Sequence, residues 1–153
     1  MKETEIFLSY ANEDRSRVER ILQAFKARGW NVFMDQDILS GAEWRKVLQS
    51  QLQTVYAVVV VWSEHSVGSE WVAREAMAGL AKDRLFPVLI DRDVTLPSSF
   101  EHKHAVDLSD WEGDPNDPKF ERVLGMIHLL WEAERGLRRD VKVLKPLRFK
   151  TGP

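Results

Sequence analysis

The sequence predicts an α/β domain in which helices cover both faces of a doubly wound, mostly parallel five-stranded sheet. Short apolar segments of strand length alternate along the chain with segments whose apolar residues recur at helical spacing. One strand segment, Val55 to Trp62, is apolar at every position, as expected for a strand with both faces covered. Such alternation implies parallel strands joined by right-handed crossovers, and a length of 153 residues suits one domain.

The first unit is a strand, a helix and a second strand. Glu5 to Tyr10 is the strand, and the polar turn after it offers Asn12 or Asp14 as a helix cap. Gly29 then ends the helix in the position that favours left-handed backbone, and Trp30 to Met34 is the second strand. The helix itself is predicted from a stripe at positions i, i+3, i+4 and i+7, formed by Val18, Ile21, Leu22 and Phe25.

The later elements continue this order. A loop from Asp35 to Glu43 leads into a helix that carries Trp44, and another helix is predicted from about Ser69 to Lys82. Leu85 to Asp91 is the fourth strand, and Pro87 removes a ladder donor, which favours a position near the strand's start or towards a sheet edge. The remaining segments are a loop with at most one helical turn, a short strand and a helix: Arg92 to Lys103, His104 to Leu108, and the segment that begins at Asp117 and Pro118.

Composition excludes several classes of function. The absence of cysteine removes disulfides, thiolate nucleophiles and cysteine-based zinc sites, and the four histidines show no spacing typical of a metal site. No apolar stretch approaches the roughly 20 residues of a spanning helix, and the N-terminus is too polar for a secretory signal, so no membrane contact and a cytoplasmic location are expected. Glycine-rich phosphate-binding motifs are also absent.

Charge divides the chain into a body, residues 1–133, and a basic tail, residues 134–153. The tail has seven Lys or Arg against two acidic residues, a net charge of +5, and the rest of the chain carries −7. An acidic body gives no indication of a nucleic-acid surface. The tail is expected to be a solvated linker, with phosphate or lipid headgroups as the alternative contact.

Five segments in order resemble a Toll/interleukin-1 receptor (TIR) domain. They are EIFLSYANED, the second strand ending in MD, the loop DQDILSGAEW, the segment VVVVWSEHSVGSEWVAREA, and LFPVLID. The resemblance covers residues 4 to 133, and the short loops are most similar to bacterial members. It implies a flavodoxin-like sheet. A response-regulator receiver has the same element order, but Trp62-Ser63 and Ser109-Asp110 stand where its aspartate and lysine would be.

The resemblance implies one of two modes of action. Many TIR domains cleave NAD+ between nicotinamide and ribose, and others act as assembly platforms through the loop after the second strand. The catalytic glutamate of the cleaving members lies in a context like S-x-W-x-x-x-E, which Ser69, Trp71 and Glu75 match here. The alternative for Glu75 is an exposed helical glutamate paired with a nearby Lys or Arg.

The proposed chemistry is consistent with a single carboxylate. Nicotinamide leaves a cationic pyridinium as a neutral base, so no general acid is needed. A carboxylate at Glu75 would hydrogen-bond the ribose hydroxyls and stabilise the positive charge that develops at the anomeric carbon. NAD+ is then the substrate, and no cofactor or metal is expected.

Further substrate-binding candidates flank this glutamate in the expected fold. By the same resemblance, Ser9, Tyr10 and Ala11 contact the nicotinamide side, with an ordinary strand-to-helix turn as the alternative. Trp71 shapes the pocket, packs in the core, or does both. Arg74 meets a phosphate or lies on a solvated helix face.

The loop after the second strand supplies the other candidates. Asp35 at its start and Trp44 at its end are expected at the substrate, with core packing as the alternative for Trp44. Self-association is expected through a segment between them, which consists of Asp37, Ile38, Leu39, Ser40 and Gly41.

The sequence thus predicts a TIR-type NAD+ glycohydrolase that acts in immune or defence signalling. Self-association would activate it, under the control of a fused or separate sensor domain. The alternative is a non-enzymatic TIR–TIR adaptor module. The product, linear ADP-ribose or a cyclic isomer, depends on pocket shape, and an aromatic side chain such as Trp44 or Trp111 near the site would fold the adenine back.

Overall fold

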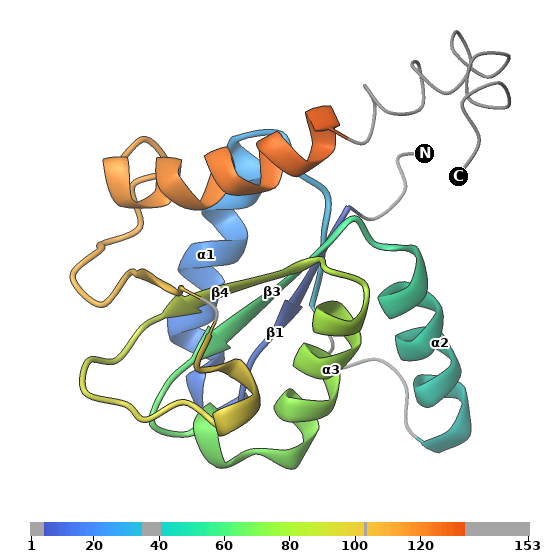
Figure 1. Cartoon of the computed structure of the whole chain (residues 1–153). Coiled ribbons are helices and arrows are strands. Elements are labelled where there is room, and N and C mark those ends of the chain that lie inside the picture. The colour runs from blue at the N-terminus through green and yellow to red at the C-terminus, as the bar shows by residue number, and fades with distance from the viewer. Residues whose placement is uncertain (1–4, 35–40, 103, 134–153) are drawn as a thin grey trace, which may run out of the picture.

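The fold is a single parallel sheet between two layers of helices (Figure 1). The computed structural model describes residues 5–34, 41–102 and 104–133, with the backbone alone for 41–45. All strand pairs in the sheet are parallel, in the order β2-β1-β3-β4-β5, which confirms the predicted fold class. The strands are β1 (Ile6–Ser9), β2 (Val32–Met34), β3 (Ala57–Trp62), β4 (Leu85–Leu89) and β5 (Val106–Asp107).

Four α-helices in the described ranges cover the sheet. They are α1 (Arg15–Ala27), α2 (Gly41–Thr54), α3 (Glu70–Ala81) and a C-terminal helix described over residues 118–133. Short 3-10 turns precede or follow them at η1 (Asn12–Asp14), η2 (Ser66–Gly68) and η3 (Ser98–Phe100). The η3 turn agrees with the prediction of at most one helical turn in the loop after the fourth strand.

The sheet separates two apolar cores. Because side chains alternate along a strand, Ile6, Leu8 and Tyr10 pack with α1 and the C-terminal helix. Phe7 points to the other face, where residues of α2 and α3 cover it. In β3 the same alternation sends Val59 and Val61 to the first core and Val58, Val60 and Trp62 to the second. All six residues of β3 are buried, as its apolar run predicts.

Several local signals in the sequence are confirmed. Gly29 has φ of +89° just after α1, the left-handed conformation expected of a helix terminator. Asp117 caps the C-terminal helix, because its Oδ1 accepts a hydrogen bond from the Lys119 backbone N–H at 2.8 Å. The prediction that Asp14 caps α1 is correct for its position and wrong for its bonding. Asp14 occupies the N-cap position of α1, but its side chain makes no capping hydrogen bond.

Pro87 lies in the middle of β4, beside Val60 of β3. The strand on its other side, β5, pairs only with Val88 and Leu89. At Pro87 the sheet therefore has no β5 partner among the described residues, and the missing N–H costs no ladder bond on that side. The proline is tolerated because β4 is an edge at this level.

The loop after β2 is shorter than predicted, because α2 begins at Gly41. The prediction had extended that loop to Glu43. Of the predicted assembly segment 37–41, Gly41 is the first residue of α2, and residues 37–40 lie outside the described residues, as do Asp35 and the tail 134–153. In the described ranges the helices are too short or too polar to span a lipid bilayer.

Candidate active site

Ser9 and Glu75 meet at the carboxyl edge of the sheet. Ser9 is the last residue of β1, and Glu75 lies in the second turn of α3. The Ser9 hydroxyl donates a hydrogen bond of 2.6 Å to Glu75 Oε1. Both residues are buried, with 0% and 2% of their surface exposed. Two residues that the sequence assigns to one site thus touch across 66 positions of chain.

The amphipathic pattern of α3 places Glu75 in this position. Ser69 caps the helix, since its hydroxyl accepts a hydrogen bond of 3.2 Å from the Val72 backbone N–H. Val72, Ala76 and Gly79 then form the buried stripe at positions i, i+4 and i+7. Glu75 follows Val72 by three residues and belongs to the same stripe. The carboxylate therefore faces the sheet, and the alternative of an exposed helical glutamate is wrong.

Burial of this carboxylate opposes folding. Desolvation of a charged carboxylate costs several kcal/mol unless hydrogen bonds or opposite charges compensate it. A carboxylate buried at the edge where open α/β folds bind their ligands is typical of a functional site. The Ser9 hydroxyl fixes the position of one carboxylate oxygen.

The Tyr10 side chain does not lie in the site that Ser9 forms with Glu75. Its ring is buried in the core beneath α1, and its hydroxyl accepts a hydrogen bond of 3.4 Å from Arg15 Nη1. The Tyr10 side chain thus points away from Glu75, because adjacent residues of a strand point to opposite faces, and its contact with the nicotinamide side of the ligand stays a prediction. Ala11 is buried, and its carbonyl accepts a hydrogen bond from the Asp14 N–H in the turn that enters α1.

The other candidates from the sequence fall into three groups. Trp71 is partly buried against the core between α3 and the sheet, which fits both readings of its role. Arg74 is exposed one position before Glu75, where it is free of the core. Asp35 and the side chain of Trp44 lie outside the described residues, so their roles stay predictions.

Trp111 lies on the opposite face of the sheet from Glu75. Its ring is buried in the α1-side core and stacks on Phe120, with 5.0 Å between ring centroids and 10° between planes. Its Nε1 donates a hydrogen bond of 2.7 Å to the Asp114 carbonyl. The suggestion that Trp111 folds the adenine back over Glu75 is therefore wrong, because the sheet separates the two side chains.

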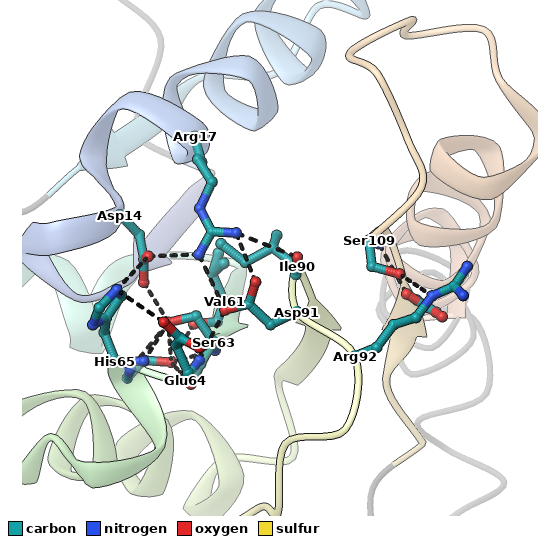
Figure 2. A network of polar contacts seen from close by, with 12 residues as sticks. Asp14, Arg17, Val61, Ser63, Glu64, His65, Ile90, Asp91, Arg92 and Ser109 are labelled. Atoms are coloured by element: carbon teal, nitrogen blue, oxygen red, sulfur yellow. Dashed lines mark hydrogen bonds and ion pairs between the residues drawn. The ribbon is translucent and has the colours of Figure 1, made fainter.

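A second group of polar residues occupies the same edge on the α1 face of the sheet (Figure 2). Asp14, only 1% exposed, accepts hydrogen bonds from Ser63 Oγ and, at 2.8 Å, from Arg17 Nη2. Arg17 Nη1 reaches Asp91 Oδ1 at 2.7 Å, and His65 Nε2 lies 4.0 Å from Asp14 Oδ1. This polar network ties together the chain segments that follow β1, β3 and β4. Sequence reasoning assigned Asp14 to capping and missed the network, since its members come from distant segments.

Hydrogen bonding shifts the ionisation of this network. The Arg17 guanidinium lowers the pKa of Asp91, against the opposing effect of burial, and the Glu64 backbone N–H adds to the lowering. The same bond to Asp91 raises the pKa of Arg17. Near the end of β5, the hydroxyl and backbone N–H of Ser109 lower the pKa of Asp107.

We expect Asp91→Asn to flatten the acid dependence of stability. The folded pKa of Asp91 is below its unfolded value, so its contribution to stability is present above about pH 4 and is lost as the pH falls through the folded pKa. Chemical denaturation between pH 2 and pH 7 measures this slope. Asp93→Asn, an exposed position two residues away, is the matched control and should keep the wild-type slope. Equal slopes for all three proteins would contradict the role of Asp91.

Comparison with known proteins agrees with this architecture. Residues 6–124 match the family described as TIR domain. The TIR domain of the Toll-related receptor TRR-2 from the lower metazoan Hydra magnipapillata is similar in structure, with a TM-score of 0.63 and 20% identity over 92% of this chain and 99% of that chain.

The TIR domains of the activated Roq1 resistosome, which directly recognises the pathogen effector XopQ, give a TM-score of 0.59. They share 19% identity over 82% of this chain and 99% of theirs. Identities this low show the fold alone. No curated protein sequence matches the chain. The family match spans most of the chain and includes both Ser9 and Glu75, so the chain belongs to the TIR domain family.

Proposed function

We propose that this TIR domain is an NAD+ glycohydrolase in which Glu75 is the catalytic carboxylate. The observation that carries the proposal is the burial of Glu75 at the carboxyl edge of the sheet, in contact with the Ser9 hydroxyl. A helix that needed only solubility would have placed this glutamate outward. Membership of a family with NAD+-cleaving members supports the assignment.

The reaction breaks the bond between the anomeric carbon of the ribose and the pyridinium nitrogen. The bonding pair goes to nitrogen, so nicotinamide leaves neutral and the ribose carbon becomes cationic. Glu75 stabilises this cation electrostatically and orients the ribose through its hydroxyls. Water then attacks to give ADP-ribose and a proton, or an atom of the same nucleotide attacks to give a cyclic isomer.

The Ser9 hydroxyl has a positioning role in this scheme. By donating to Oε1 it holds the carboxylate plane in one orientation, so the charge need not reorganise as the cation forms. A preorganised charge of this kind is worth most where water is excluded, which suits two residues with at most 2% exposure.

Assembly is the second part of the proposal. The Roq1 TIR domains are part of an activated resistosome. By analogy, we propose that this domain self-associates in the cytoplasm through residues 37–41, at the junction of the loop after β2 with α2, under a fused or separate sensor in defence signalling. Activity should then rise more steeply than in proportion to protein concentration.

A nicotinamide-release assay tests the proposal. Wild-type protein, both dilute and clustered on a multivalent support, is incubated with NAD+ and the products are separated by chromatography. We expect release from NAD+ and none from NADH, because dihydronicotinamide is uncharged while bound to the ribose and is a poor leaving group. Loss of release in Glu75→Ala supports the assignment. Clustered wild-type protein that releases no nicotinamide would instead favour a non-enzymatic adaptor.

A further inference from the structure

Trp62 carries a buried donor that the fold does not satisfy. It is the last residue of β3 and is 0% exposed. Within the described part of the chain its Nε1–H has no hydrogen-bond acceptor. An unmade hydrogen bond of this kind costs about 1–3 kcal/mol, so a buried indole N–H normally finds a partner. Trp111 illustrates the usual case, since its Nε1 bonds the Asp114 carbonyl.

The described residues that pack around Trp62 offer no hydrogen-bond acceptor for its Nε1–H. Trp62 belongs to the core between the sheet and helices α2 and α3, together with Val72 and Ala76. Its ring lies 5.2 Å from that of Phe100, at an angle of 48° between planes. An aromatic face accepts an N–H only weakly, so this contact explains the ring's position better than the nitrogen. A phenylalanine or leucine would fill an apolar core without the cost.

Register places Trp62 beside the candidate active site. Ser9 pairs with Val60, and Trp62 lies two residues further along β3 on the same face of the sheet. Two residues along a strand and one strand across correspond to about 8 Å between the Cα atoms of Ser9 and Trp62. An indole spans such a distance. Val72 and Ala76, which pack in the same core as Trp62, flank Glu75 along α3.

Chemistry identifies the matching acceptor. A ribose hydroxyl that donates its proton to the Glu75 carboxylate still has lone pairs that accept a hydrogen bond. We propose that Trp62 is a substrate-binding residue whose indole N–H donates to a ribose hydroxyl oxygen of the nicotinamide nucleotide. The inference rests on the proposed function of Glu75. It adds a donor on the strand to the acceptor on the helix, so that one hydroxyl is held from both sides.

The kinetic test removes the N–H with the least change of shape. Trp62→Phe keeps an aromatic ring against Phe100, and incorporation of 3-benzothienylalanine at position 62 keeps the whole bicyclic ring and loses only the donor. We expect the KM for NAD+ to rise about three- to tenfold, as the loss of one neutral hydrogen bond predicts, with a smaller change in kcat. Trp111→Phe removes the same ring volume on the other sheet face and should leave KM unchanged.

A spectroscopic test works without turnover. The indole N–H signals of the six tryptophans are recorded by NMR in the Glu75→Gln protein, which is expected to consume its ligand about 100- to 1000-fold more slowly, and NAD+ is added. The Trp62 signal, assigned by its loss in Trp62→Phe or by its proximity to the Phe100 ring, is expected to shift, and the Trp111 signal to stay in place.

The outcomes separate this inference from the proposed function. If wild-type protein cleaves NAD+ while position 62 variants keep their KM and the Trp62 signal does not move, the inference is wrong and the proposed function stands. If nothing is cleaved but NAD+ shifts the Trp62 signal, the domain binds the nucleotide through Trp62 without cleaving it. A stationary signal in a protein that also fails to cleave overturns both.

Discussion

Replacing Glu75 with glutamine is expected to slow nicotinamide release by about 100- to 1000-fold, the usual effect of removing one preorganised electrostatic group from an active site. Glutamine has nearly the shape of glutamate, and its Oε1 accepts the Ser9 hydrogen bond, so the packing of α3 on the sheet is kept. Only the charge is lost. Because the shape of the side chain and its hydrogen bond with Ser9 are kept, we expect the variant to stay folded. Steady-state release and thermal unfolding of the same samples measure both effects.

Glu70→Gln is the matched control. Glu70 lies in the first turn of the same helix but is exposed, so the same change of charge occurs in solvent. We expect wild-type activity and a loss of at most about 1 kcal/mol, from the weaker interaction with the helix dipole. A Glu75→Gln protein with wild-type turnover would remove the carboxylate from the mechanism. Equal loss of activity in Glu75→Gln and Glu70→Gln would show that activity depends on the net charge of the helix and not on the position of Glu75.

The sequence predicts the architecture of this site well because its signals are local. The apolar run that forms β3 requires cover on both faces, and the pattern after it requires a helix. Ser9 at the end of one strand and Glu75 early in the helix after another then belong to the same sheet edge by the rules of parallel sheets. The hydrogen bond between Ser9 and Glu75 could not be predicted from the sequence and is seen only in the structure.

Prediction from the sequence fails where a side chain could lie on either face of the sheet or could bond to more than one partner. Alternation along β1 separates Ser9 from Tyr10, but only packing decides that α3 covers the Ser9 face. Asp14 stands at a helix start, where capping is the local expectation, and a distant serine and arginine engage it instead. Trp62 looks like the end of an apolar strand, and its unsatisfied nitrogen is invisible until its neighbours are placed. These features depend on tertiary contacts, which the spacing of residues along the sequence does not predict.

A methyl group at position 79 is expected to destabilise the domain more than any other single small change that we consider. Gly79 lies on the buried stripe of α3, and a Cβ built there would be 2.8 Å from the Cβ of Val58 in β3. Val58 is a central-strand residue whose β-carbon cannot turn aside, so the helix must move off the sheet. We expect Gly79→Ala to cost about 1–3 kcal/mol, although alanine favours helix by about 1 kcal/mol.

Gly125→Ala tests whether this loss comes from the contact or from the glycine itself. Gly125 also lies within a helix, the segment 118–133, but a Cβ there would have no neighbour within 4 Å. The propensity gain is then unopposed, so the melting temperature should rise by about 2–4 °C, whereas Gly79→Ala should lower it by about 3–10 °C. The same substitution thus changes stability in opposite directions at two helical sites. If both variants were stabilised, α3 would have room to move away from β3, and the packing that buries Glu75 would be looser than the 2.8 Å approach requires.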